Sequence, residues 1–374
     1  MKPKLRFKEF SDEYVLSDLG KYLIQYKKTT NSNNQYPVLT SSRSGIFFQE
    51  DYFNRQVASK DNTGYNIVPR NYFTYRHMSD DTIFSFNINT LCDYGIVSTL
   101  YPVFTTNTEM NSNYLKEYLN NSKRFSEYCL LQKQGGSRTY MYFDKLKKFV
   151  GCFPSIQEQT KVSNFLSLID KKIDLQSKKI EDLKLFKKGL ILSLKKNSFD
   201  WHTVCIKDLF KITRGVVIPK NELSEFKNGE YKYPVYSSQT SNEGILGYSD
   251  TFDFNGKYLT WTTDGANAGK VFYRNGKFRC TNVCGVLYED NIIFTNELFA
   301  ELLNYETPKH VSYVGNPKLM NNVMADIKIK IPSGDVQENT SLIINTINNK
   351  VNLEKKKLLK FKELKKGLMQ NMFV

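Results

Sequence analysis

The sequence has few of the residues that build metal centres and disulfide frameworks. Only 3 His occur among its 374 residues, and none of them is spaced with Cys or Asp as a metal site requires. The 6 Cys show no paired pattern, and no apolar run is long enough for a membrane-spanning helix. The polar segment after Met1 lacks the apolar core of a signal peptide. We therefore expect a cytoplasmic protein with reduced thiols, no metal and no membrane contact.

Motifs of catalysis are also missing. Residues 265–271 resemble a phosphate loop, but the spacing is one residue short and Val271 replaces the hydroxyl that would hold Mg²⁺. Cys280 and Cys284 lie in a strand-like run and are interpreted as buried thiols. The sequence has no Asn-Pro-Pro-aromatic motif and no glycine-rich cofactor loop after a strand, and its scattered acidic residues form no recognisable nuclease cluster. Catalysis is unsupported.

What the sequence does have is aromatic residues and positive charge. With 26 Phe and 24 Tyr, the chain is predicted to fold, and its length allows two or three domains. The net charge of +15 favours a polyanionic partner. Residues 153–196 carry 10 Lys against 5 acidic residues, and residues 331–374 carry 8 against 4. Because a basic helix face is often only solvated, charge alone leaves nucleic-acid binding open.

Residues 154–196 give the strongest secondary-structure signal, that of a long helix. Ser155 and Glu158 match a capping box, in which the Ser155 hydroxyl accepts from the Glu158 N–H and the carboxylate reaches back to the Ser155 N–H. Apolar residues then recur alternately four and three apart: Val162, Leu166, Ile169, Ile173, Ile180, Leu183, Leu190 and Leu194. This heptad pattern predicts that the helix packs against a partner helix.

A copy of this helix lies 178 residues further on (332 − 154 = 178), in residues 331–374. It repeats the heptad series without a gap, and it repeats the two polar exceptions as well. Glu354 takes the position of Gln176. Lys365 takes the position of Lys187. The second helix is therefore the predicted partner of the first.

The segments before each helix are predicted to be mixed α/β domains with short aromatic strands. Residues 18–19 are echoed by residues 208–209, residues 36–38 by 233–235, and residues 45–46 by 244–245, at offsets that drift from 190 to 199. Helical spacing occurs at residues 113–131 and 297–304. The predicted order is domain 1–152, helix 153–197, domain 198–330 and helix 331–374. The predicted fold is α+β, with the two helices paired antiparallel in an intramolecular coiled coil of pseudo-two-fold symmetry.

Three motifs suggest a family. Residues 154–159 read Pro-Ser-x-x-Glu-Gln, residues 185–190 read Leu-Phe-Lys-Lys-Gly-Leu, and a Thr-Thr-Asp-Gly-Ala run begins at Thr262, with Thr281-Asn282-Val283 beyond it. Together with the domain order, these resemble the specificity subunits of type I restriction-modification systems over essentially the whole chain. The second helix departs from the family pattern, because residues 336–338 read Val-Gln-Glu and its capping box is lost.

The resemblance implies a non-catalytic reader of double-stranded DNA. Each domain would be a target-recognition domain for one half of a split, asymmetric site, and the coiled coil would fix the gap between the halves. Two adenine-N6 methyltransferase subunits would dock on the helices, and motor-nuclease restriction subunits would join for restriction. S-adenosylmethionine, ATP and Mg²⁺ would belong to these partners, and the chain itself would hold no cofactor.

Candidate contact residues are polar side chains on loops near the aligned strands, since Arg can fork to guanine and Gln or Asn to adenine. The candidates for DNA contact are Ser41, Ser42, Arg43, Arg76, Ser137 and Arg138 in the first domain, and Ser238, Gln239, Thr240, Lys318 and Asn321 in the second. The polar seam positions are predicted to mark the register of the helices or to dock the methyltransferases: Gln176, Lys187, Glu354 and Lys365. An alternative interpretation is a coiled-coil structural adaptor whose two domains bind proteins.

Overall fold

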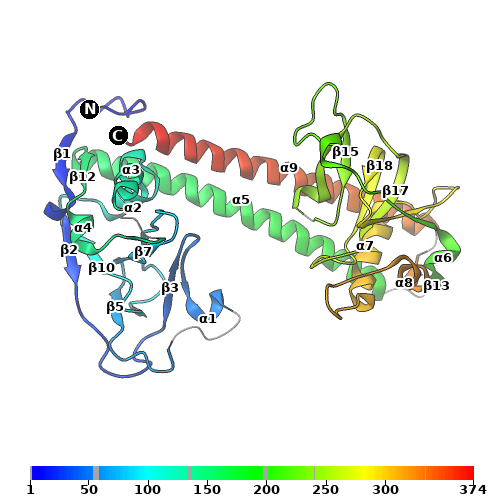
Figure 1. Cartoon of the computed structure of the whole chain (residues 1–374), viewed down its shortest axis with the longest axis horizontal. Helices are drawn as coiled ribbons and strands as arrows, with labels where there is room; N and C mark the ends of the chain where they lie inside the picture. Colours follow the sequence, from blue (N-terminus) through cyan, green and yellow to red (C-terminus); the bar gives the residue numbers. More distant parts are fainter. Residues whose placement is uncertain (1, 54–58, 134–136, 197–200, 240, 333) are drawn as a thin grey trace. The chain divides into compact units, whose positions relative to one another are not determined.

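Two long helices, α5 (Ile156–Lys196) and α9 (Gly334–Met372), hold the two copies of the sequence repeat in the computed structural model (Figure 1). Residues 2–53, 59–133, 137–196, 201–239, 241–332 and 334–374 are described. They form two units, one made of Met1–Gln176 with Lys357–Val374 and the other of Ser177–Lys356. Each unit thus contains one domain and one end of each long helix.

The first unit is built on an antiparallel sheet with the strand order β2-β10-β6-β8. Four two-stranded pairs accompany it: β1 with β12, β3 with β4, β5 with β9, and β7 with β11. The strands are β1 (Val15–Asp18), β2 (Leu23–Tyr26), β3 (Leu39–Ser42), β4 (Gly45–Phe48), β5 (Asn66–Pro69), β6 (Phe73–Thr74), β7 (Met78–Ser79), β8 (Asn87–Ile88), β9 (Tyr94–Val97), β10 (Val103–Thr106), β11 (Thr139–Tyr140) and β12 (Val150–Phe153). The short helices are η1 (Leu19–Lys21), α1 (Gln49–Tyr52), α2 (Ser112–Asn121), α3 (Lys123–Leu131) and α4 (Phe143–Lys147).

The second unit has a six-stranded sheet with the order β14-β19-β17-β18-β15-β16, and β13 pairs with β20 beside it. The strands are β13 (His202–Cys205), β14 (Lys211–Arg214), β15 (Tyr233–Tyr236), β16 (Ile245–Ser249), β17 (Phe254–Thr262), β18 (Val271–Cys280), β19 (Cys284–Tyr288) and β20 (Lys328–Ile331). The short helices are α6 (Ile206–Leu209), η2 (Lys220–Glu222), η3 (Ser241–Gly244), α7 (Glu297–Glu306), η4 (Thr307–His310) and α8 (Asn321–Asp326).

Both domains share one topology. In the first, β10 pairs with β2 and β6, and in the second, β19 pairs with β14 and β17. The hairpin of β17 and β18 is split in the first domain into two pairs, β5 with β9 and β6 with β8. Val38 bridges Ile96 in parallel, as Val235 pairs with Arg279 in parallel. The predicted echo of residues 36–38 at 233–235 therefore joins equivalent positions of the two sheets.

One predicted echo is wrong. Strands β1 and β12 correspond to β13 and β20, which aligns Val15 with His202 (202 − 15 = 187). Leu19 then matches Ile206, the first residue of α6, and not Leu209. The residue types at 18–19 and 208–209 are similar, but the strand pairing shows that these residues are not structural counterparts.

The helix pairing is antiparallel, as predicted. In the first unit, Val162 and Leu166 of α5 share a core with Met369 and Met372 of α9. In the second unit, the opposite ends meet, since Ile191 of α5 shares a core with Ile344 of α9. Ile191 is buried there, whereas the predicted seam residue Leu190 is only half-buried.

Two helix boundaries differ from the predictions. The Ser155 hydroxyl accepts from the Glu158 N–H at 3.4 Å, so half of the capping box forms. The Glu158 carboxylate accepts hydrogen bonds from the Arg6 guanidinium and from the Tyr14 hydroxyl. The helical segment at 113–131 is divided into α2 and α3, because Ser122 adopts an extended conformation and caps α3 through the Phe125 N–H.

Candidate nucleic-acid interface

Two predicted arginines of the first domain meet at one acidic turn. The guanidinium of Arg43 lies 2.5 Å from Asp81, and that of Arg138 lies 3.1 Å from Asp80. The bond from Arg43, supported by the Ser79 hydroxyl, holds the pKa of Asp81 below its ordinary value. Both arginines are exposed. The two residues are thus brought together from loop positions 95 residues apart (138 − 43 = 95). Each guanidinium could exchange its aspartate for a phosphate or a base edge.

The predicted serines of the first domain differ in exposure. Ser41 is only 7% exposed, its hydroxyl donates to the Thr74 carbonyl, and it accepts from the Asn87 amide. Ser42 is half-buried and donates to the Gly45 carbonyl. Ser41 therefore ties β3 to the neighbouring strands and leaves little surface for a ligand, while Ser137, like Arg76, is exposed.

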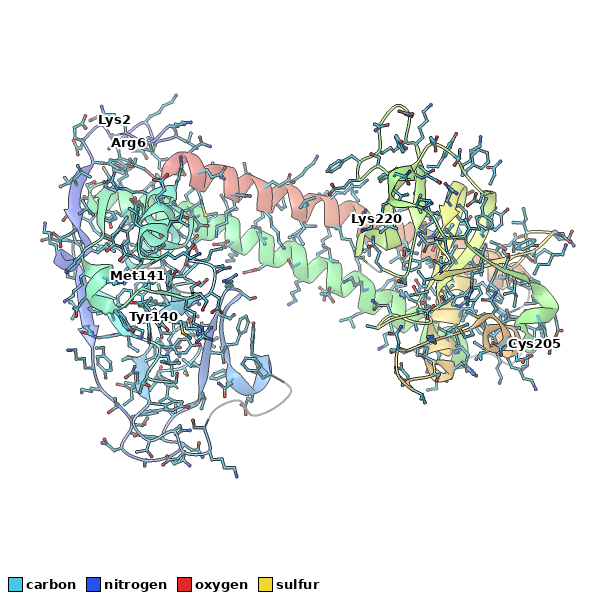
Figure 2. The ribbon with its side chains drawn as sticks, in the orientation of Figure 1. Lys2, Arg6, Tyr140, Met141, Cys205 and Lys220 are labelled. Carbon is cyan, nitrogen blue, oxygen red and sulfur yellow. The ribbon has the colours of Figure 1, made fainter. Side chains whose placement is uncertain are left out.

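An aromatic stack adjoins this arginine pair, and the sequence reading missed it. The His77 and Tyr142 rings stack with centroids 4.9 Å apart, and Tyr142 stacks on Tyr140 at 5.7 Å. The stack lies at the end of β11 and over the two residues that follow it. There the Met141 N–H donates to the His77 carbonyl, and Figure 2 labels Tyr140 and Met141. The alternation of Tyr140 and Tyr142 was the available signal, since residues two apart share one face of an extended backbone.

In the second domain, the predicted residues Ser238 and Gln239 lie on the turn between β15 and β16. Ser238 is half-buried, and the Gln239 side-chain amide donates to the Ile245 carbonyl. The turn is closed by the Ser237 N–H, which donates to the Gly244 carbonyl at 3.0 Å. Thr240 lies outside the described residues.

Lys318 lies in the segment of the second domain that corresponds to the aromatic stack, and Asn321 follows that segment. At the repeat offset, Lys318 matches Tyr140 (318 − 140 = 178), and it lies 3.8 Å from Asp264 across an isolated bridge. Asn321 begins α8, and its Oδ1 is buried without a hydrogen-bond partner. The two domains therefore present different side chains at equivalent places.

The scaffold under these places is the same in both domains. The buried Tyr75 hydroxyl donates to the Met141 carbonyl at 2.9 Å. The buried Trp261 Nε1 donates to the Leu319 carbonyl at 3.0 Å. Because each aromatic residue anchors the strand that carries the variable side chains, the backbone is held while those side chains differ.

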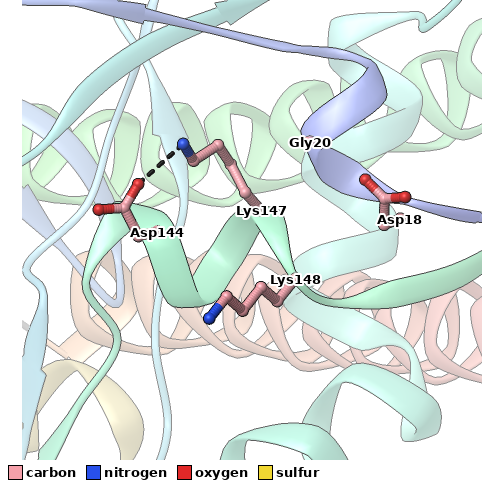
Figure 3. Close-up of a pocket in the computed structure, with 5 residues that line it drawn as sticks. All are labelled: Asp18, Gly20, Asp144, Lys147 and Lys148. Carbon is pink, nitrogen blue, oxygen red and sulfur yellow. Dashed lines mark ion pairs between the residues drawn. The ribbon is translucent and has the colours of Figure 1, made fainter.

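Within the residues that the structure describes, no three His, Cys, Asp or Glu side chains gather to hold a metal ion. An open cavity of about 770 Å³ in the first domain is lined by Asp18, Gly20, Asp144, Lys147 and Lys148 (Figure 3). The bond from Lys147 lowers the pKa of Asp144, so this carboxylate is a salt-bridge partner. No helix among the described residues is long and apolar enough to cross a membrane.

The polar seam residues are engaged inside their units. In the first unit, the Lys365 ammonium lies 2.7 Å from Asp170 and 3.2 Å from Glu117. In the second, the Lys187 ammonium lies 2.8 Å from the Asn348 amide oxygen and 2.6 Å from Glu301.

The remaining two seam positions are less symmetric. Glu354 is buried and accepts from Lys179 at 2.9 Å, and Gln176 is half-buried. Asp170 and Asn348 are themselves repeat counterparts (348 − 170 = 178). The contact of Lys365 with Asp170 and that of Lys187 with Asn348 are therefore equivalent, and one is formed in each unit.

Comparisons with known proteins identify the family. A model of the type I restriction modification DNA specificity domain matches residues 199–363. A putative type I specificity subunit of Mycoplasma pneumoniae is 44% identical over 145 residues, which are 38% of this chain and 76% of that protein. The chain belongs to the type I restriction-modification specificity subunits. A second putative specificity subunit of M. pneumoniae is 35% identical to it over 198 residues, covering 51% of this chain and 78% of the relative.

The fold of this specificity subunit agrees with that of a solved one. The crystal structure of a type I restriction-modification S subunit from M. genitalium superposes with a TM-score of 0.64 at 14% identity, covering 100% of this chain and 99% of that chain. At this identity the likeness concerns the fold. The fold with two domains and a long helix pair is therefore shared with that solved S subunit.

Proposed function

We propose that this specificity subunit reads a split, asymmetric site in double-stranded DNA, with each domain contacting one half. It would position adenine-N6 methyltransferase subunits, and restriction subunits would join the same complex. The chain itself supplies recognition and no catalysis. Its basic character favours the DNA backbone as a partner, because phosphate contacts position a protein while side chains at base edges specify the sequence.

One observation carries this proposal. The two domains place different side chains on one scaffold: His77, Tyr140 and Tyr142 in the first domain correspond to Thr263, Lys318 and Met320 in the second. A reader of two different half-sites needs such a pair, since its framework must repeat while its contacts must not. We propose that Arg43, Arg76, Arg138 and the aromatic stack contact the first half-site, and that Ser238, Gln239 and Lys318 contact the second.

Sequencing of methylated bases tests the proposal. A host that expresses this chain with its methyltransferase is expected to gain one bipartite adenine-methylated motif that is absent when either gene is deleted. A deletion that changes no motif contradicts the proposal and favours the alternative, a coiled-coil adaptor whose two domains bind proteins. Exchange of residues 198–330 for the corresponding domain of another specificity subunit serves as the matched control, because it should alter only one half of the motif.

The polar seam positions and the docking of methyltransferases are separate features in our proposal. The lysines at 187 and 365 are occupied within the chain and would fix the helix register. Outward-facing apolar residues repeat instead at the helix offset: Leu175 with Leu353, and Phe186 with Leu364, all more than half exposed. Because the same exposed apolar residues occur twice, we propose that they dock two copies of one partner, the methyltransferase.

Substitution of both leucines tests this surface. The Leu175→Glu/Leu353→Glu variant is expected to lose most of the methyltransferase that co-purifies with the chain, since buried carboxylates without partners weaken an interface strongly. Leu185→Glu is the matched control: Leu185 is also exposed, but its repeat counterpart is the acidic Glu363. Equal losses for both variants, or no loss for the double variant, would contradict the assignment of the surface.

A further inference from the structure

Arg274 is a cation held inside the second domain. It lies on β18 and is only 6% exposed. Its guanidinium carbon lies 3.5 Å from the centre of the Tyr236 ring and 4.4 Å from that of Phe272. Its Nε donates to the Thr260 hydroxyl at 3.2 Å. Burying a charge is costly unless its hydrogen bonds are satisfied, so this position requires an explanation.

The remaining bond leads to the turn between β15 and β16. The Arg274 Nη2 donates to the Glu243 carbonyl at 2.7 Å. This carbonyl belongs to a backbone that is unfavourable for most residues, because Asn242 and Glu243 have φ values of 48° and 55° and Gly244 has 86°. Non-glycine residues rarely adopt the left-handed region unless surrounding contacts hold them there.

The turn and the arginine fit closely. A Cβ on Gly244 would come within 3.1 Å of the Arg274 Nη2, which is closer than most Cβ contacts in proteins. Tyr236, which lies against the guanidinium, is the last residue of β15 before the turn. Arg274 therefore contacts both the entrance of the turn and its left-handed end.

We propose that Arg274 is a positioning residue that holds the β15–β16 turn in its left-handed conformation and thereby sets which bases the second domain accepts. The proposal rests on the proposed function, in which Ser238 and Gln239 of this turn contact DNA. Arg274 itself is too buried to reach a base. A planar guanidinium suits the task, because it can lie against an aromatic ring and donate from its edge at the same time.

Hydrogen exchange tests the positioning without DNA. In the Arg274→Met variant of the full chain, the amide of Ser237 is expected to exchange at least about tenfold faster, because its acceptor in the turn is no longer held. Arg279→Met is the matched control: Arg279 lies on the same strand and has a mostly buried side chain, but it bonds Glu222 and Asp253. It should leave exchange at Ser237 unchanged. Unchanged exchange in the Arg274→Met variant would overturn the proposal.

Binding to DNA tests the consequence. The complex with methyltransferase is titrated with the cognate duplex and with duplexes in which each half-site is altered in turn. Arg274→Met is expected to reduce the discrimination at one half-site about tenfold or more and to leave the other unchanged, since one good base-reading pair is worth roughly that much. Arg274→Lys should resemble Arg274→Met, because an ammonium cannot replace the planar fork.

The outcomes separate this proposal from the proposed function. If the wild-type complex shows no discrimination at either half-site, both the proposed function and the proposed role of Arg274 are contradicted. If the wild-type complex discriminates and Arg274→Met retains discrimination at both halves, only the role of Arg274 falls. A loss at both halves together with a lowered melting temperature would show that Arg274 supports the fold alone, which also overturns the proposal.

Discussion

Replacement of Arg6 by methionine is expected to lower the free energy of unfolding by about 3–5 kcal/mol. Arg6, labelled in Figure 2, donates to both oxygens of Glu158 at 2.9 and 2.8 Å, and Glu158 is only 1% exposed. Without the guanidinium, a buried carboxylate keeps the Tyr14 hydroxyl as its remaining partner at 3.0 Å. Urea denaturation followed by circular dichroism measures the loss.

The repeat supplies the control for this variant. At the counterpart of Glu158, the second helix carries Val336 (336 − 158 = 178), so the same helix position exists without a charge. The double variant Arg6→Met/Glu158→Val should recover most of the lost stability, because removal of both partners leaves no unpaired charge. Arg43→Met, which breaks an exposed ion pair, should cost less than about 1 kcal/mol. A double variant as unstable as Arg6→Met would show that the N-terminal segment acts through packing alone.

The sequence predicted the helices well because their information is local and repeated. Heptad spacing and a copy at one fixed offset are visible in the sequence, and they predict that the two helices pair with each other. It did not reveal that Lys187 and Lys365 each bond a glutamate of the adjoining domain, Glu301 and Glu117. Those contacts require α7 and α2 to lie against the seam, which depends on how each domain folds.

The candidate interface was harder to predict. Loop position predicts contact for Arg43 and Arg138, and the structure places both at neighbouring aspartates. The same reasoning predicts contact for Ser41, but Ser41 is buried and bonds Thr74 and Asn87. Loop position in a sequence indicates neither burial nor partner, since both are decided by strands that pair across long separations. The sequence gives no prediction for Arg274, because a lone arginine within a strand does not indicate that it supports a turn.

Insertion of seven residues into both long helices is expected to lengthen the gap between the two half-sites by about three base pairs. The inserted segments would follow Gln176 in α5 and Lys356 in α9, where the two units meet in the chain. Seven helical residues add about 10 Å, and one base pair occupies about 3.4 Å. All contacts within each unit are retained. Sequencing of methylated bases measures the gap, and an unchanged gap would refute the proposal that the helices act as a ruler.

The same insertion in α5 alone is expected to abolish methylation, at least about a hundredfold below the wild-type level. Asp170 bonds Lys365 in the first unit, and Lys187 bonds Asn348 in the second. Both contacts tie α5 to α9, so lengthening one helix forces the extra turns to bulge out or separates one of these pairs. A seven-residue insertion at Gly229, in an exposed turn, should leave both gap and activity unaltered. The added length in α5 is identical in the two variants, and only the register between α5 and α9 differs. A difference between them therefore tests the proposal that the repeated lysines fix this register.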